Sequence, residues 1–329
     1  MKPEIIAELA QGFEGSKQQA MLLLKAAASS GADSAKFQIV FAEELATKDY
    51  KHYQLFSSLE MKDSDWIELN EFAIKNKLNL YTDVFGKKSL KLSEKMNLKA
   101  IKVHGTDISN ISFLKEIAKS KIPKVFLGVG GANKKEISIA IKILKNKKIN
   151  LMLGFQSYPT PNKANQLSRM HLFKKIFKDK ELGFADHSNP QEKISYILPS
   201  VAMTLGAAVI EKHLTLGKLM KIEDFESALN PDEFKIFSTA LKQSYQALGT
   251  YKNIEDFGMS SSESSYRKMI RRDVVASKNI KKGVKINHSH LSLKRTSNQN
   301  ALKNFDIIIG KKVLRNLKKN CSITKKDIE

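Results

Sequence analysis

The sequence predicts an α/β protein in which eight parallel strands, alternating with helices, close into a barrel and are followed by a small β-rich domain. Two observations predict the barrel: eight short apolar runs recur over about 250 residues, and segments with helical periodicity lie between them. Short strand-like runs after a polar stretch predict the second domain. The chain has 329 residues, 42% hydrophobic and 27% charged, which is enough for both cores.

The eight apolar runs are often β-branched and have the length of buried strands in a parallel sheet. An open, doubly wound parallel sheet is the structural alternative, but no GxGxxG sequence follows the first run. We therefore expect a closed barrel with right-handed crossovers. The runs cover residues 4–10, 34–40, 78–84, 100–105, 124–130, 149–155, 181–187 and 207–214.

Capping residues mark the helices between these runs. Ser16 precedes the amphipathic segment 17–29, and Gly31 follows it. Asn133, with Glu136 three residues later, has the pattern of a capping box. Strands and helices therefore alternate along the first 250 residues, as a (β/α)₈ barrel requires.

The C-terminal part changes in character after a helix that we expect to end near Leu248. Residues 251–271 are polar, rich in serine and without periodicity, which predicts a linker. Residues 272–329 hold strand-like runs punctuated by Gly283 and Gly310, which predicts a small β domain. We thus divide the chain into a barrel domain (1–250), a linker (251–271) and a C-terminal domain (272–329). A core that small gives only marginal stability, so we expect this domain to pack against another surface.

Composition excludes several classes of protein. The one cysteine, Cys321, rules out an internal disulfide and a multi-thiolate zinc site, and fits a reducing compartment. No signal-peptide pattern and no membrane-spanning apolar stretch is present, so we expect a soluble, cytoplasmic protein. The net charge of +22 fits a polyanionic partner, but only six of the 56 basic residues are arginine. Without a finger motif or stacking aromatics, the sequence argues against specific nucleic-acid binding.

Polar residues gather at the carboxyl ends of the predicted strands, where barrels of this kind hold their active sites. Each residue alone could be a solvent-facing group or a hydrogen-bonded core residue. Their convergence on one rim predicts a functional site. They are Glu8, Lys36, Gln38, Thr82, Asp83, Lys102, His104, Asp107, Gln156, Tyr158, Asp186, His187, Glu211, Lys212 and His213.

Two pairs in this group carry specific chemistry. His187 and His213 end neighbouring strands, so both imidazoles could bind one divalent ion and leave positions open for water and substrate. A hydrogen-bonded histidine pair without metal is the alternative. Lys36 and Lys102 could bind a phosphate or carboxylate. The glycine-rich turn at 128–133 could bind an anion through its N–H groups, or could be a tight turn only.

Several motifs extend this interpretation from single residues to a family. The sequence contains IIAELAQGFEGS, AKFQ, GFQSYPTP, GFADHS and VIEKHLTL, and its tail reads DVVASKNIKKG, LSLKR and GKKVL. In these motifs the chain resembles, nearly end to end, the sialic acid synthase family, which includes the N-acetylneuraminate, legionaminate and pseudaminate synthases. The resemblance implies a TIM barrel followed by an antifreeze-like SAF domain of β-clip type. It also implies a domain-swapped homodimer in which the SAF domain reaches over the partner's barrel.

The resemblance implies a reaction as well. Such enzymes condense phosphoenolpyruvate with an N-acylated amino sugar, such as N-acetylmannosamine, to give a nine-carbon 2-keto acid and phosphate, with Mn²⁺ or Mg²⁺. The positions that match the metal ligands are His187 and His213. Those that match the phosphoenolpyruvate site are Lys36, Thr82, Lys102, Thr106, Gln156 and Tyr158. Glu8, Gln38, Asp224 and Arg295 match positions near the sugar, and we expect Glu8, Gln38, His187 and His213 to be catalytic.

The chain also departs from the family. Hydroxyl side chains of the family's phosphate pocket are absent at Gly105, Gly128 and Ala185, and Thr106 with the backbone amides of residues 130–132 could replace them. These departures leave two other functions open. One is a Schiff-base aldolase that uses Lys102 as nucleophile. The other is a non-catalytic relative that binds an anionic sugar or a polyanion.

Overall fold

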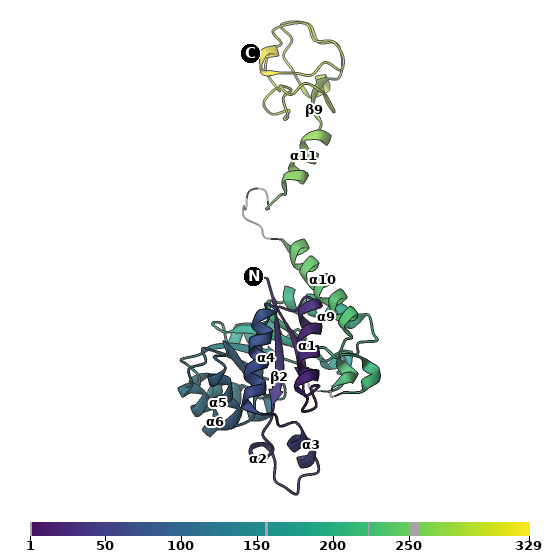
Figure 1. Ribbon diagram of the computed structural model, residues 1–329. Coiled ribbons are helices and arrows are strands. Elements are labelled where there is room, and N and C mark those ends of the chain that lie inside the picture. Colours follow the sequence, from purple (N-terminus) through teal and green to yellow (C-terminus); the bar gives the residue numbers. More distant parts are fainter. Residues whose placement is uncertain (1, 155–156, 223, 250–254, 256) are drawn as a thin grey trace. The chain divides into compact units, whose positions relative to one another are not determined.

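The computed structural model describes residues 2–154, 157–222, 224–249, 255 and 257–329. The chain divides into two compact units, Met1–Gly249 and Thr250–Glu329. The larger unit is a closed barrel of eight parallel strands covered by helices (Figure 1), which confirms the predicted fold class. No helix in the described part of the chain is both long enough and apolar enough to cross a membrane.

The strands of the barrel pair in chain order, and β8 returns to pair with β1. All eight neighbouring pairs are parallel, so every carboxyl end lies at the same end of the barrel. The predicted apolar runs correspond to these strands. They are β1 (Glu4–Ala10), β2 (Ser34–Ile39), β3 (Asn79–Val84), β4 (Ala100–Val103), β5 (Lys124–Gly128), β6 (Lys148–Leu153), β7 (Glu181–Asp186) and β8 (Ala207–His213).

Helices cover the outside of the barrel, and they begin where the capping residues predict. The Ser16 hydroxyl accepts a hydrogen bond from Gln19 N at 3.2 Å. Asn133 and Glu136 form the expected capping box. The helices are α1 (Lys17–Ser29), α2 (Ala42–Leu45), α3 (Tyr53–Ser58), α4 (Asp63–Lys75), α5 (Lys87–Lys95), α6 (Ile111–Lys119), α7 (Lys134–Ile143), α8 (Arg169–Ile176), α9 (Ile194–Thr204) and α10 (Pro231–Leu248).

Alternation along each strand separates two cores. Outward-facing residues pack against the helices, as Phe37 does with Phe13 and Trp66, whose rings meet edge to face. Inward-facing residues fill the barrel with a second apolar cluster of Ile6, Tyr81, Ala100, Phe126, Met152, Ala185 and Val209. Two residues further along the strands, toward their carboxyl ends, inward-facing positions carry charge, so the apolar cluster forms the floor of a polar site.

The smaller unit has its own core around Val274, Ile286 and Ile308. It contains α11 (Ser261–Ile270) and a two-stranded antiparallel sheet of β9 (Asp273–Ala276) and β10 (Leu291–Lys294). We expected the stretch that holds α11 to be an irregular linker. The Ser260 hydroxyl accepts from Glu263 N at 3.1 Å, and this N-cap starts a helix where apolar periodicity gave no signal.

Candidate active site

A cluster of buried charged side chains lies inside the barrel above the apolar floor. Glu8, Lys36, Asp83, Lys102 and Glu211 come from five strands, and none is more than 5% exposed. Lys36 Nζ contacts Glu8 Oε2 and lies 2.7 Å from Asp83 Oδ1 and 3.7 Å from Glu211 Oε2. Lys102 Nζ lies 2.5 Å from Glu211 Oε1. Two ammonium groups are therefore held among three carboxyl groups.

Burial and these neighbours shift the charge states in opposite directions. Burial raises the pKa of Glu8 to about 8, against the opposing effect of the Lys36 ammonium. For Glu211, burial acts to raise the pKa, but Lys102 and Lys36 outweigh it and bring the pKa to about 2. Burial likewise acts to lower the pKa of Lys36, and Asp83, Glu211 and Glu8 reverse this, so the pKa is well above its usual value. Near neutral pH, Glu8 therefore carries a proton while Glu211 is ionised.

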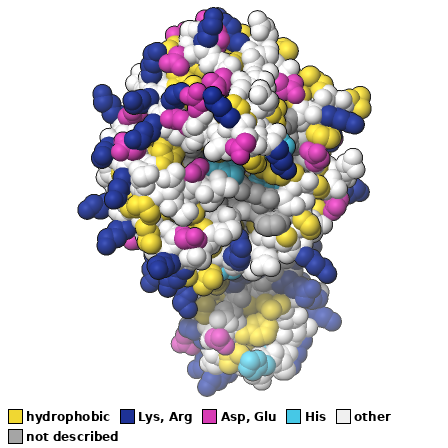
Figure 2. Space-filling model, turned by 90° about the horizontal axis from the view of Figure 1, so that it is seen from below, with side chains coloured by type: hydrophobic (Ala, Val, Ile, Leu, Met, Phe, Trp, Pro, Cys, Tyr) yellow, Lys and Arg dark blue, Asp and Glu magenta, His cyan; other side chains and the backbone are white. Residues whose placement is uncertain are grey.

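Two imidazoles lie at the carboxyl ends of β7 and β8. The rings of His187 and His213 have centroids 5.1 Å apart at an interplanar angle of 49°, and the residues are 4% and 3% exposed. Burial lowers the pKa of His187 to about 4 and that of His213 well below its ordinary value, so both rings are neutral at pH 7. Figure 2 looks at this end of the larger unit, where histidine side chains line a hollow in the surface.

The histidine pair has donor atoms suited to a divalent ion. His187 Nδ1 is buried and has no hydrogen-bond partner within the described residues, and His213 Nδ1 lies 3.6 Å from Asp224 Oδ2. Neutral imidazoles are common ligands of divalent transition metals. No set of three or more His, Cys, Asp or Glu side chains that could hold a metal occurs in the described ranges. An ion at the pair would therefore need water or substrate to complete its coordination.

Thr82 does not face this site, although we expected it to bind phosphoenolpyruvate. Its Oγ1 lies 3.2 Å from Ser93 Oγ of α5, outside the barrel. The next residue, Asp83, points inward to Lys36. Thr82 pairs in register with outward-facing Phe37, whereas Asp83 pairs with Gln38. Counting alternate residues along β3 from this register would have selected Asp83.

The remaining predicted residues of the barrel surround the mouth. Gln38 Oε1 accepts from Gln11 Nε2 at 2.9 Å. The Tyr158 ring lies edge-on to both imidazole rings, at 5.0 Å from that of His187 and 5.8 Å from that of His213.

The other residues that the sequence predicts for the site are Thr106, Gln156 and Arg295. Thr106 Oγ1 lies 2.9 Å from His104 Nδ1, in the loop after β4. Gln156 lies outside the described residues. Arg295 belongs to the smaller unit, where it follows β10 and is exposed.

Close packing of the backbone explains one of the missing hydroxyl side chains, the one at Gly128. A Cβ atom on Gly128 would lie 2.9 Å from Gly105 N, and one on Gly130 would overlap the carbonyl oxygen of Gly154. The loops after β4, β5 and β6 therefore approach too closely for side chains at these positions. Together they border a narrow cavity beside the imidazoles, lined by Lys102, Gly105, Gly128, Gly130, Met152, Gly154, Ala185 and His187.

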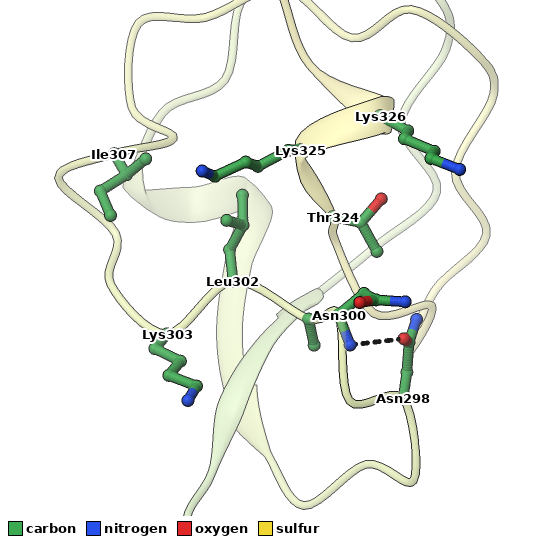
Figure 3. A pocket seen from close by; sticks show the side chains of 9 residues that line it. Asn298, Asn300, Leu302, Lys303, Ile307, Thr324, Lys325 and Lys326 are labelled. Carbon is green, nitrogen blue, oxygen red and sulfur yellow. Dashed lines mark hydrogen bonds between the residues drawn. The ribbon is translucent and has the colours of Figure 1, made fainter.

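The smaller unit contains a wider hollow of about 630 Å³, shown in Figure 3. Asn300 N donates to Asn298 Oδ1 at 3.0 Å on one side, and the side chains of Lys303, Lys325 and Lys326 surround it. Its lining includes no histidine and no carboxylate. Acid–base chemistry therefore belongs to the barrel and not to this hollow.

Comparisons with known proteins agree with this geometry. Residues 23–253 match the NeuB family and residues 271–329 match the SAF domain. The chain is 31% identical to N,N'-diacetyllegionaminic acid synthase of Campylobacter jejuni, over 97% of this chain and 98% of that protein. It is 32% identical to an uncharacterized protein of Methanocaldococcus jannaschii, over 94% of this chain and 89% of that protein. The crystal structure of N-acetylneuraminic acid synthetase from Leptospira borgpetersenii superposes with a TM-score of 0.72 at 25% identity, covering 82% and 92% of the two chains.

Proposed function

Because this chain belongs to the NeuB family, we propose that it condenses phosphoenolpyruvate with an N-acylated amino sugar and consumes one water molecule, to give a nine-carbon 2-keto acid and inorganic phosphate. Relatives that are named as nonulosonic acid synthases support this reaction class. The observation that carries the proposal is the pair of buried, neutral imidazoles beside a narrow cavity that Lys102 lines. N-acetylmannosamine and related N-acylhexosamines are the acceptors to test.

The charged cluster can position phosphoenolpyruvate. Lys36 and Lys102 are held by carboxylates, so each ammonium is in place before a phosphate or carboxylate arrives. The N–H groups of the packed glycine loops, with Thr106, are donors for the phosphate oxygens. Tyr158, whose ring lies edge-on to both imidazoles, is the residue beside them that we expect to contact phosphoenolpyruvate. For Gln156 the same role rests on the family match alone.

The same cluster can supply a proton to the substrate. As the enol carbon attacks the aldehyde carbon of the sugar, negative charge develops on the aldehyde oxygen and must be neutralised. Glu8 carries a proton near neutral pH and is the acid of the cluster that can supply it. His187 and His213 would hold a divalent ion, Mn²⁺ or Mg²⁺, which supplies Lewis-acid polarisation of that oxygen when bound.

Gln38, Asp224 and Arg295 match family positions near the sugar. Gln38 and Asp224 border the mouth from the barrel. We propose that Arg295 contacts the N-acyl group across a domain-swapped homodimer. Light scattering should then report a dimer, and Arg295→Ala should raise KM for the sugar while leaving KM for phosphoenolpyruvate unchanged. A monomer with full activity would contradict this arrangement.

The reaction itself is tested by phosphate release. Purified protein with phosphoenolpyruvate, Mn²⁺ and a panel of N-acylhexosamines should release inorganic phosphate, and EDTA should stop the release. His213→Ala should abolish activity, while His171→Ala, which alters an exposed histidine on α8, should not. Absence of phosphate release across N-acetylmannosamine and its diacetamido analogues would contradict the proposal.

The two alternatives give different results in simple assays. A Schiff-base aldolase would be trapped by borohydride with pyruvate and would ignore EDTA. The site offers little support for it, since Lys102 Nζ donates to Glu211 at 2.5 Å instead of standing free in the cavity. A non-catalytic binder would show affinity for polyanions that falls steeply with salt, and no affinity for phosphoenolpyruvate.

A further inference from the structure

A second buried ion pair lies outside the barrel at the ends of β7 and β8. Asp186 and Lys212 are direct partners in the register of the two strands. Lys212 Nζ lies 2.8 Å from Asp186 Oδ2 and 3.1 Å from Ser188 Oγ, and both charged side chains are fully buried. Asp186 Oδ1 accepts from Ser188 N at 2.9 Å. In this cluster of Lys212, Asp186 and Ser188, both carboxylate oxygens therefore accept hydrogen bonds and the ammonium has two acceptors.

The cluster is adjacent in sequence to both imidazoles. Asp186 precedes His187 and Lys212 precedes His213, and alternation along the strands places the ion pair outside and the imidazoles inside. The backbone of the imidazole residues is also held, because Thr160 N donates to His187 O at 2.7 Å and Leu229 N donates to His213 O at 3.0 Å. Hydrogen bonds therefore hold both the side chains on the outer face of β7 and β8 and the backbone of the two residues that carry the imidazoles.

Stability does not explain a buried ion pair at this place. Desolvation of two charges offsets most of their attraction, and apolar side chains of similar volume are often as stabilising. Other outward-facing positions of the same strands, Leu182, Phe184 and Ile210, are apolar and pack against the helices. Unlike apolar packing, the hydrogen bonds of the ion pair are directional, so they allow only one relative placement of β7 and β8.

We propose that the cluster of Lys212, Asp186 and Ser188 is a positioning device that fixes the separation and orientation of the His187 and His213 imidazoles. The inference rests on the proposed function, since it assumes that the two rings act as one site. Groups that orient metal ligands from behind commonly affect metal affinity by about 10- to 100-fold. A small slide of β8 against β7 would change the 5.1 Å ring separation directly.

The test separates positioning from stability with a double variant. Lys212→Met alone leaves the Asp186 carboxylate buried without its cation, and such a protein can fail to fold. Lys212→Met combined with Asp186→Asn removes both charges and keeps side chains of similar size, so we expect a melting temperature near that of the wild type. Mn²⁺ affinity, measured by electron paramagnetic resonance of the free ion, should nevertheless fall by about 10-fold or more.

Two single variants calibrate the effect. Ser188→Ala removes the hydroxyl contact with Lys212 and should weaken Mn²⁺ binding less than the double variant does. Lys124→Met breaks a partly exposed ion pair with Glu4, on the amino-terminal side of β1 and β5, and should leave Mn²⁺ binding unchanged. A double variant that is stable and binds Mn²⁺ as tightly as the wild type would overturn the proposal.

A metal-free measurement distinguishes this proposal from the proposed function. If the wild type binds no Mn²⁺, the metal part of the proposed function fails, and the imidazoles are then followed by NMR with ¹³Cε1-labelled histidine. The double variant should shift the signals of His187 and His213 and leave that of His171 in place. Unchanged signals from both site histidines would reject the positioning role independently of any metal.

Discussion

Two buried charge clusters lie on opposite faces of the barrel wall, and they are built differently. The inner cluster places Lys36 and Lys102 among three carboxyl groups, and within the described residues Asp83 Oδ2 and Glu211 Oε2 accept no hydrogen bond. The outer cluster pairs Lys212 with Asp186 one to one, and both carboxylate oxygens accept hydrogen bonds. Both clusters are therefore buried, but the carboxylate oxygens of the inner cluster are less completely hydrogen-bonded than those of the outer cluster.

The difference indicates different roles. A buried polar atom without a partner costs about 1–3 kcal/mol, so a fold keeps such atoms where a ligand can use them. The inner cluster has them, and His187 Nδ1 nearby is a third. The outer cluster gains nothing from a ligand and serves the geometry of the strands. Of these two clusters, the one with unpaired buried oxygens lies on the proposed binding face, and the one whose carboxylate oxygens both accept hydrogen bonds lies on the supporting face.

The largest expected effect comes from breaking the inner cluster at its centre. Lys36→Met removes the cation 2.7 Å from Asp83 and leaves Lys102 as the one ammonium of the cluster. We therefore expect a loss of about 3–5 kcal/mol in the free energy of unfolding, measured with urea, and loss of phosphate release. Lys124→Met, at a partly exposed pair, should cost no more than about 1 kcal/mol. Equal losses in the two variants would show that the inner cluster is not special.

One substitution on each face compares how much stability each cluster loses when a single carboxylate is removed. Asp186→Asn removes the sole carboxylate paired with Lys212 and should cost about 3 kcal/mol. Asp83→Asn leaves Lys36 with Glu211 and with Glu8, whose carboxyl ionises more readily once the repulsion from Asp83 is gone, and should change stability by less than about 1 kcal/mol. Asp83→Asn should instead raise KM for phosphoenolpyruvate, because Lys36 loses one of its positioning contacts. The reverse order of stabilities would contradict our assignment of the two faces.

Local signals in the sequence predicted much of this architecture. Apolar runs and caps located the strands and helices, and the dipeptides Asp186-His187 and Lys212-His213 fell at the ends of consecutive strands. Parallel pairing then required both imidazoles to lie at one end of the barrel. That step needs only topology, which is why the histidine pair could be predicted before the fold was known.

Features that depend on side-chain direction or on non-local contact were not predicted. Thr82 was assigned to the phosphoenolpyruvate site because it matches a family position, whereas strand alternation decides that Asp83 and not Thr82 faces the site. The packing of Gly130 against Gly154 joins loops that are distant in sequence. The ion pair of Lys212 with Asp186 is likewise a contact between strands, visible only once β7 and β8 are placed side by side.

Close packing of the glycine loops makes a smaller prediction about the same end of the barrel. Gly130→Ala should lower the free energy of unfolding by about 1–3 kcal/mol, because its Cβ would overlap the Gly154 carbonyl oxygen. Gly217→Ala is the matched control, since a Cβ there meets nothing within 4 Å. Thermal unfolding of both variants checks this. A stable, fully active Gly130→Ala variant would mean that the loops are looser than the backbone indicates.

The smallest expected effect is a pH dependence of stability that comes from Glu8 and His187. Folding raises the pKa of Glu8 to about 8, so between its ordinary pKa and pH 8 the folded protein holds a proton that the unfolded chain has lost, and stability falls as pH rises. Folding lowers the pKa of His187 to about 4, so this residue makes stability rise with pH up to its ordinary pKa near 6.5. The two trends oppose each other below pH 6.5, and only the decline due to Glu8 remains between pH 6.5 and 8.

Urea unfolding in EDTA should therefore show wild-type stability falling by at most about 2 kcal/mol over that interval, relative to Glu8→Gln. If stability still declined with pH in Glu8→Gln, another group would hold the proton. Glu8 would then not be the acid that gives a proton to the substrate.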